Sequence, residues 1–156
     1  MNELTRRFLV QAAIAAVFYG RWVARPSVAA EEGKAATPRV AIEGYDPVAY
    51  FTDGRPVKGS AAFSLPFDEA VYYFANAEHQ KMFAADPDRY APQFSGYCTV
   101  GLSMGVKVEA DPEAWVISDG KLYVFYSKKG PALFAKDPAS MIAKADANWT
   151  TLKGQR

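Results

Sequence analysis

Residues 72–98 read YYFANAEHQKMFAADPDRYAPQFSGYC, and this stretch organises the rest of the chain. It begins as a strand, because the β-branched and aromatic residues at 71–74 favour extended backbone. Asn76 offers a side-chain oxygen as the N-cap of a helix over Ala77–Ala85, which Asp86-Pro87 ends. The only histidine (His79) and the only cysteine (Cys98) of the protein both lie here. We therefore expect any chemical centre to be in this stretch.

The flanking sequence predicts two hairpins. Strands are expected at 61–67 and 70–74, joined at Asp68-Glu69, and at 115–117 and 122–126 around Asp119-Gly120. Shorter strands are expected at 40–42 and 106–108, an irregular segment at 101–105, a turn at Asp111-Pro112, and helices at 131–136 and 138–149. No internal repeat indicates a repeat array. The pattern predicts a small single α+β domain, a twisted antiparallel sheet with short helices packed on it.

Length and composition restrict the class of protein. The chain has 156 residues, of which 50% are hydrophobic, so it can form one domain with a substantial core. A single cysteine excludes an intramolecular disulfide and a four-cysteine zinc site. A formal net charge of +1 gives no electrostatic support for nucleic-acid binding.

The N-terminus predicts export. Arg6-Arg7 precede an apolar segment at 9–19, which fits a twin-arginine signal and is too short and too weakly apolar for a membrane span. We expect a signal peptide at 1–30, cleaved after Ala30, a flexible segment at 31–38 and a folded domain at 39–152. Removing four arginines and one glutamate from 18 basic and 17 acidic residues leaves 14 and 16 in a periplasmic mature chain. The alternative is an uncleaved amphipathic or anchoring helix.

Four side chains could form a soft metal site. In a helix that begins after Asn76, His79 and Met82 share one face, and the positive end of the helix favours the neutral imidazole that can ligate a metal. Chain reversal at Pro87 and Pro92 could bring Cys98 back beside this helix, with Met82 or Met104 adding a thioether. Such a set suits copper(I), or zinc completed by a carboxylate or water. The competing interpretation is a hydrogen-bonded structural histidine, a buried thiol and methionines that fill the core.

Two further hypotheses use other chemistry. Aromatic residues could line an apolar pocket in which Asp46 or Arg89 orients a small organic ligand; the aromatic candidates are Tyr45, Tyr50, Phe51, Tyr73, Tyr97 and Trp115. Cys98 could instead act as a nucleophile with His79, although Cys98 does not begin a predicted helix, the position that commonly activates a thiol. The sequence has no second histidine and no acidic cluster, so neither a serine-type triad nor a two-metal hydrolase is supported.

Several motifs together resemble the YHS domain family. They are Tyr45-Asp46-Pro47-Val48, Tyr72-Tyr73-Phe74 and the segment FAADPDRY at 83–90. Gly96-Tyr97-Cys98 and the segment AKADANW at 143–149 look like the longer, exported bacterial form of that family. The resemblance extends from about Arg39 to Trp149.

The resemblance implies metal chemistry. Short YHS domains are similar to cysteine-rich metal-binding modules, and they occur attached to heavy-metal and copper-transporting P-type ATPases and to some multicomponent monooxygenases. Here Ala49 and Ala75 stand at two of the family's three cysteine positions and His79 at the third. The site has therefore either moved, with Cys98 as a new ligand, or been lost.

These observations lead to one expectation and one alternative. We expect an exported, periplasmic YHS-domain protein, more a binding protein than an enzyme, that binds copper, or zinc, and exchanges it with a metal-transport or redox partner. Its expected ligands are His79, Cys98, Met82 and Met104. The alternative is a module without metal that binds a small organic ligand or a partner in an aromatic pocket, formed by Tyr45, Asp46, Tyr50, Tyr97 and Arg89.

Overall fold

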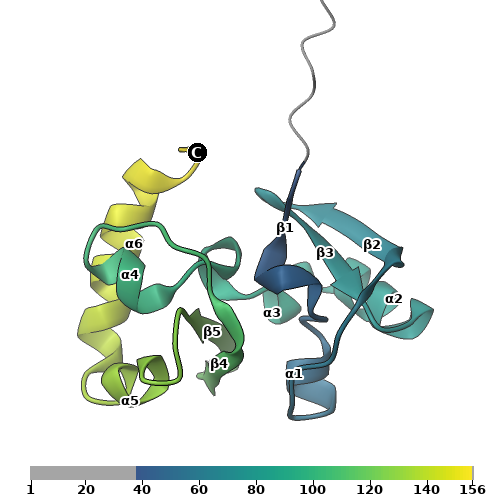
Figure 1. Cartoon of the computed structure of the whole chain (residues 1–156), viewed down its shortest axis with the longest axis horizontal. Coiled ribbons are helices and arrows are strands. Elements are labelled where there is room, and N and C mark those ends of the chain that lie inside the picture. Colours follow the sequence, from purple (N-terminus) through teal and green to yellow (C-terminus); the bar gives the residue numbers. More distant parts are fainter. Residues whose placement is uncertain (1–37, 156) are drawn as a thin grey trace, which may run out of the picture. The chain divides into compact units, whose positions relative to one another are not determined.

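The computed structural model describes residues 38–155, shown in Figure 1. The predicted signal peptide at 1–30 and the segment 31–37 lie outside the described residues. The first elements are β1 (Arg39–Val40), the 3-10 turn η1 (Ala41–Gly44) and α1 (Ala49–Thr52). They lead into the first predicted hairpin, in which β2 (Ser60–Phe67) pairs antiparallel with β3 (Ala70–Phe74), and β1 pairs parallel with β3 on its other edge.

The helix of the organising stretch forms as predicted. It is α2 (Ala77–Ala85), and Asn76 Oδ1 accepts from the His79 amide at 2.9 Å. Asp86 in turn caps α3 (Pro87–Tyr90), whose first residue is a proline that needs no hydrogen bond there. The chain then passes through the 3-10 turn η2 (Gln93–Gly96).

The second part of the chain differs from expectation in three places. The segment expected to be irregular contains α4 (Thr99–Ser103), and the expected strand at 106–108 is not formed. The second hairpin begins earlier than expected, because Asp111-Pro112 lies within β4 (Asp111–Ser118) instead of forming a turn. This strand pairs antiparallel with β5 (Lys121–Phe125), and α5 (Gly130–Phe134) and α6 (Pro138–Leu152) follow.

The expected α+β class is confirmed, with the strands divided between two small sheets. The order is β1-β3-β2 in one sheet and β4-β5 in the other. Two hydrophobic clusters form the core, and β5 contributes to both: Leu122 and Val124 belong to the first cluster, Tyr123 and Phe125 to the second. Alternate side chains of a strand point to opposite faces, so one strand serves two cores. No helix found between residues 38 and 155 combines the length and apolar character that a membrane crossing requires.

The order of elements occurs twice, although the sequence analysis detected no repeat. We call residues 40–91 the first half and residues 92–152 the second half. Each half runs through a 3-10 turn, a short helix, a hairpin and two further helices. The offset between equivalent residues is 52 at the turn, from Gly44 to Gly96, and 51 in the hairpin, from Asp68 to Asp119.

Local geometry repeats as closely as the order of elements. Each 3-10 turn holds two successive residues and then a glycine at positive φ: Ile42, Glu43 and Gly44 at 41°, 52° and 77°, and Phe94, Ser95 and Gly96 at 56°, 52° and 81°. The hairpins have the same register, with equivalent first pairs (Ser60↔Phe74, Asp111↔Phe125) and a bulge at the same place. Both halves end a helix with Phe-Ala-x-Asp-Pro, whose aspartate caps the next helix.

Candidate functional site

In the first half, a buried carboxylate holds the only histidine. Asp46 is fully buried, and its Oδ2 lies 2.6 Å from His79 Nδ1, an arrangement in which the imidazole N–H donates. The amides of Val48 and Ala75 donate to the same carboxylate at 2.9 and 2.8 Å. The turn after η1 therefore positions Asp46, the start of α2 positions His79, and three hydrogen bonds satisfy the buried carboxyl group.

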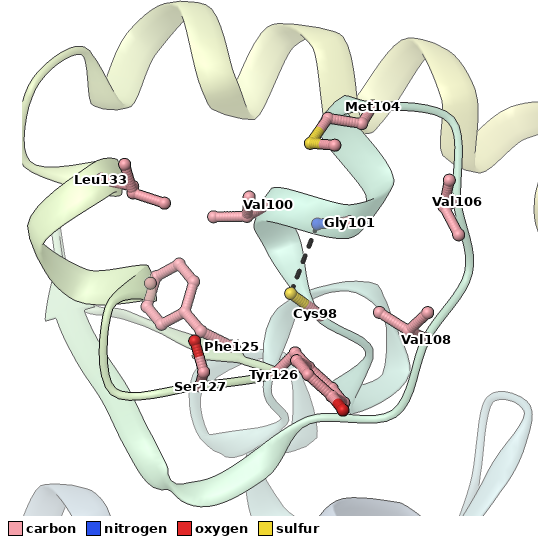
Figure 2. Close-up of a pocket in the computed structure, with 11 residues that line it drawn as sticks. Cys98, Val100, Gly101, Met104, Val106, Val108, Phe125, Tyr126, Ser127 and Leu133 are labelled. Atoms are coloured by element: carbon pink, nitrogen blue, oxygen red, sulfur yellow. Dashed lines mark hydrogen bonds between the residues drawn. The ribbon is translucent and has the colours of Figure 1, made fainter.

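In the second half, a cavity of about 300 Å³ opens beside Cys98. Figure 2 shows the side chains that surround it, which come from α4, the segment after α4, the end of β5 and α5. We call it the Cys98 cavity. It is lined by Cys98, Val100, Gly101, Met104, Val106, Val108, Phe125, Tyr126, Ser127, Gly130 and Leu133. The only side chains with polar groups in this set are those of Cys98, Tyr126 and Ser127.

The mouth of the Cys98 cavity carries exposed apolar side chains. Within residues 38–155, four large apolar side chains are strongly exposed, and all four line this cavity: Met104 (72%), Tyr126 (70%), Val106 (50%) and Leu133 (42%). Single exposed apolar residues are ordinary on a protein surface, but a cluster around a cavity indicates a binding site.

Cys98 begins a helix, contrary to the sequence analysis. It is the N-cap of α4, and its Sγ accepts from the Gly101 amide at 3.3 Å, drawn as a dashed line in Figure 2. Its own amide donates to the Val108 carbonyl at 3.0 Å, which fixes the thiol at the wall of the cavity. Cys98 is 3% exposed, so a molecule reaches the sulfur through the cavity.

The structure divides the four expected metal ligands between the two halves. Cys98 and Met104 line the Cys98 cavity, whereas His79 bonds Asp46 and Met82 packs against the first hydrophobic cluster. Across residues 38–155, no group of three or more histidine, cysteine, aspartate or glutamate side chains could hold a metal ion. Of the four predicted ligands, the Cys98 thiol and the Met104 thioether are therefore the two that share a cavity.

The five residues of the expected aromatic pocket have other surroundings. Tyr50 is buried, donates to the Pro112 carbonyl at 3.0 Å and packs edge-on against Trp115; burial raises its pKa. Asp46 binds His79, as described above. Lys58 lies over the ring of Tyr45, and the exposed Arg89 lies 5.2 Å from the ring of Tyr90.

Tyr97 borders a second hollow, which shares Val106 with the Cys98 cavity. The volume of this hollow is about 420 Å³, and Lys107 and Glu109 also line it. The Arg39 guanidinium lies 3.9 Å and the Lys107 ammonium 4.7 Å from the centre of the Tyr97 ring. These contacts hold the ring in place by cation–π attraction.

Sequence reasoning missed most of the cavity wall, because valine and leucine, the residue types at positions 100, 108 and 133, are also the commonest types in protein cores. One signal was present. Gly96-Tyr97-Cys98 matches Gly44-Tyr45-Asp46, and the segment FAKDP at 134–138 matches FAADP at 83–87. Aligning the halves on these motifs places Cys98 at the position of Asp46 and Gly130 at the position of His79.

Comparison with known proteins gives no relative for this chain. No family model, no curated protein and no solved structure matches it.

Proposed function

We propose that this protein binds a small, largely apolar molecule in the Cys98 cavity. The observation that carries the proposal is the combination of a cavity of about 300 Å³ with a rim that holds all four strongly exposed large apolar side chains of residues 38–155. Ligand sites in proteins are concave, mostly apolar and supplied with a few polar groups, and this cavity fits that description. Removing the rim and the ligand from water supplies the driving force.

A second candidate is copper(I), bound by Cys98 and Met104. The observation in its favour is that a thiol and a thioether line the same cavity, since soft sulfur ligands select copper(I). The sequence resemblance to YHS domains and the twin-arginine export signal support the same proposal: a periplasmic protein that receives the ion from a metal-transport or redox partner. His79 is not a ligand of this candidate, because it does not line the Cys98 cavity.

The test uses the mature chain, residues 31–156, purified without a histidine tag or chelator. Native mass spectrometry and elemental analysis would be applied to the wild type and to Val100→Phe, which fills the cavity with a larger side chain. An organic mass that is retained by the wild type and lost in Val100→Phe supports the first candidate. A wild type that retains no organic mass and takes up none from a library of small apolar compounds overturns it.

The copper candidate has a matched pair of variants. Met104→Leu and Met82→Leu each remove one sulfur while keeping the size of the side chain, and Met82 lies in the first half. About one copper per chain after anaerobic loading, reduced in Met104→Leu and in Cys98→Ser but not in Met82→Leu, supports copper binding in the cavity. Equal copper content in all four proteins contradicts it.

A further inference from the structure

The two halves place different side chains at equivalent points of the same order of elements. The amides of Asp46 and Cys98 donate to equivalent carbonyls, those of Val57 and Val108, at 2.8 and 3.0 Å. Each side chain also accepts from a backbone amide shortly after it: Asp46 from Val48, the N-cap of α1, and Cys98 from Gly101 within α4. Cys98 therefore stands where Asp46 stands in the first half.

The partner of Asp46 has no counterpart in the second half. The offset of 51 that relates Phe83 to Phe134 and Asp86 to Asp137 relates His79 to Gly130, which has no side chain. The Cys98 cavity is lined by both Cys98 and Gly130, so it lies between the two positions that the Asp46–His79 hydrogen bond connects in the first half.

The chain cannot fill this space from position 130. A Cβ on Gly130 would overlap Phe125 Cβ, because α5 approaches β5 too closely for any side chain there. Position 130 thus has no counterpart of the His79 side chain, because Phe125 lies where a side chain there would begin. The cavity beside it offers the Cys98 sulfur and the hydroxyls of Tyr126 and Ser127 as polar groups, and an aromatic wall formed by Phe125 and Tyr126.

From this equivalence we infer the class of ligand: a small flat ring, largely apolar, that carries one N–H or O–H donor on its edge. The ring lies against the aromatic wall of the cavity, and its donor points at Cys98 Sγ, the position at which Asp46 accepts from His79 in the first half. Sulfur is a weak acceptor, so the ligand is less polar than imidazole. This inference rests on the proposed function and narrows it.

Indole and indene test this inference, because they have similar size and shape and only indole carries an N–H group. Their affinities would be measured by titration, following backbone amide resonances of the wild type, Cys98→Ala and Met104→Leu. We expect both to shift Gly101 and Gly130, and indole to bind the wild type about two- to fivefold more tightly, the effect of one weak hydrogen bond. The preference should disappear in Cys98→Ala and persist in Met104→Leu.

The outcomes separate the two proposals. If neither compound binds the wild type, the proposed apolar ligand site is overturned. If both bind with equal affinity, that site stands and the inferred donor is wrong. A preference for indole that persists in Cys98→Ala also contradicts the inference, because the acceptor is then another group. If Cys98→Ala does not fold, nuclear Overhauser contacts between the indole N–H and Cys98 Hβ in the wild type decide the question: their presence supports the inference and their absence overturns it.

Discussion

The first half and the second half have the same order of helices and strands, and they differ in the side chains between the short helix and the helix after the hairpin. In the first, Asp46 and His79 close the space between the short helix and the helix after the hairpin with a buried hydrogen bond. In the second, Cys98 and Gly130 leave it open as a cavity with an apolar rim. The turns and helix caps recur in both halves, so the difference between a closed half and a half with a cavity lies in the side chains that fill them.

The largest expected effect on stability comes from substitution at the equivalent positions 46 and 98. Asp46→Ala leaves three donors without their acceptor in a fully buried place, so we expect a loss of about 3–5 kcal/mol in the free energy of unfolding. Cys98→Ala removes one atom beside an existing cavity and should cost about 1 kcal/mol. Urea denaturation measures both. Similar losses for the two variants would contradict the comparison.

The closed half should open when its histidine is removed. His79→Ala leaves Asp46 with two backbone donors, and we expect a loss of about 2–3 kcal/mol. Free imidazole should bind the new space and raise the urea midpoint of this variant, through preferential binding to the folded state. The wild type is the control and should not respond. An identical response of both proteins would show that imidazole acts elsewhere.

The helices after the two hairpins offer a matched pair of charge substitutions. Met82 packs against the first hydrophobic cluster, whereas its equivalent, Leu133, is 42% exposed at the mouth of the cavity. We expect Met82→Lys to cost about 1–3 kcal/mol, since it buries part of a charged side chain. Leu133→Lys should cost about 0.5 kcal/mol or less and still weaken indole binding. Equal losses in the free energy of unfolding for Met82→Lys and Leu133→Lys would mean that both positions are equally buried, and would contradict the comparison.

The smallest effect is expected in the hairpin turns. Asp68 and Asp119 occupy equivalent left-handed positions, at φ values of 52° and 50°, which asparagine also tolerates. Of these two aspartates, Asp68 bonds residues that follow the first half: its carboxylate accepts from Lys153 at 2.7 Å and from Ser95 at 2.5 Å. Burial acts to raise the pKa of Asp68, but these hydrogen bonds outweigh it, and the pKa is lowered.

A lowered pKa fixes the sign of the pH dependence. The folded state binds the proton of Asp68 less well than the unfolded state, so its stabilisation is present at neutral pH and is lost as the pH falls through the folded pKa. Asp68→Asn should therefore cost up to about 1 kcal/mol at pH 7 and nothing in strong acid, whereas the exposed Asp119→Asn should be near neutral throughout. Urea midpoints across this pH range test both variants, and a pH-independent difference for Asp68→Asn would contradict the assignment.

Local signals made much of the fold predictable. Asn76 and Asp86-Pro87 determine both ends of α2, and Asp119-Gly120 marks the second hairpin. A turn was predicted at Asp111-Pro112, but these residues begin β4. The prediction failed because an edge strand tolerates proline at its first residues. Cys98 was not recognised as a cap, because its role depends on a backbone turn that η2 imposes.

The site was less predictable than the fold. His79 and Cys98 were identified as the chemical residues, and the structure gives each a distinct environment. The cavity itself has no sequence motif, since most of its lining consists of apolar residue types that are also common in protein cores. The repeat escaped detection because the two halves share few side chains, and positive φ values, which sequence shows only through glycine, carry most of the likeness.

The division of β5 between two cores has a consequence for cooperativity. Leu122 and Val124 pack into one cluster, while Tyr123 and Phe125 pack into the other. Unfolding of either half therefore exposes the side chains on one face of β5. A molecule seated against Phe125 would slow hydrogen exchange at amides of the first half that it never touches. We therefore expect the two halves to unfold in one cooperative transition.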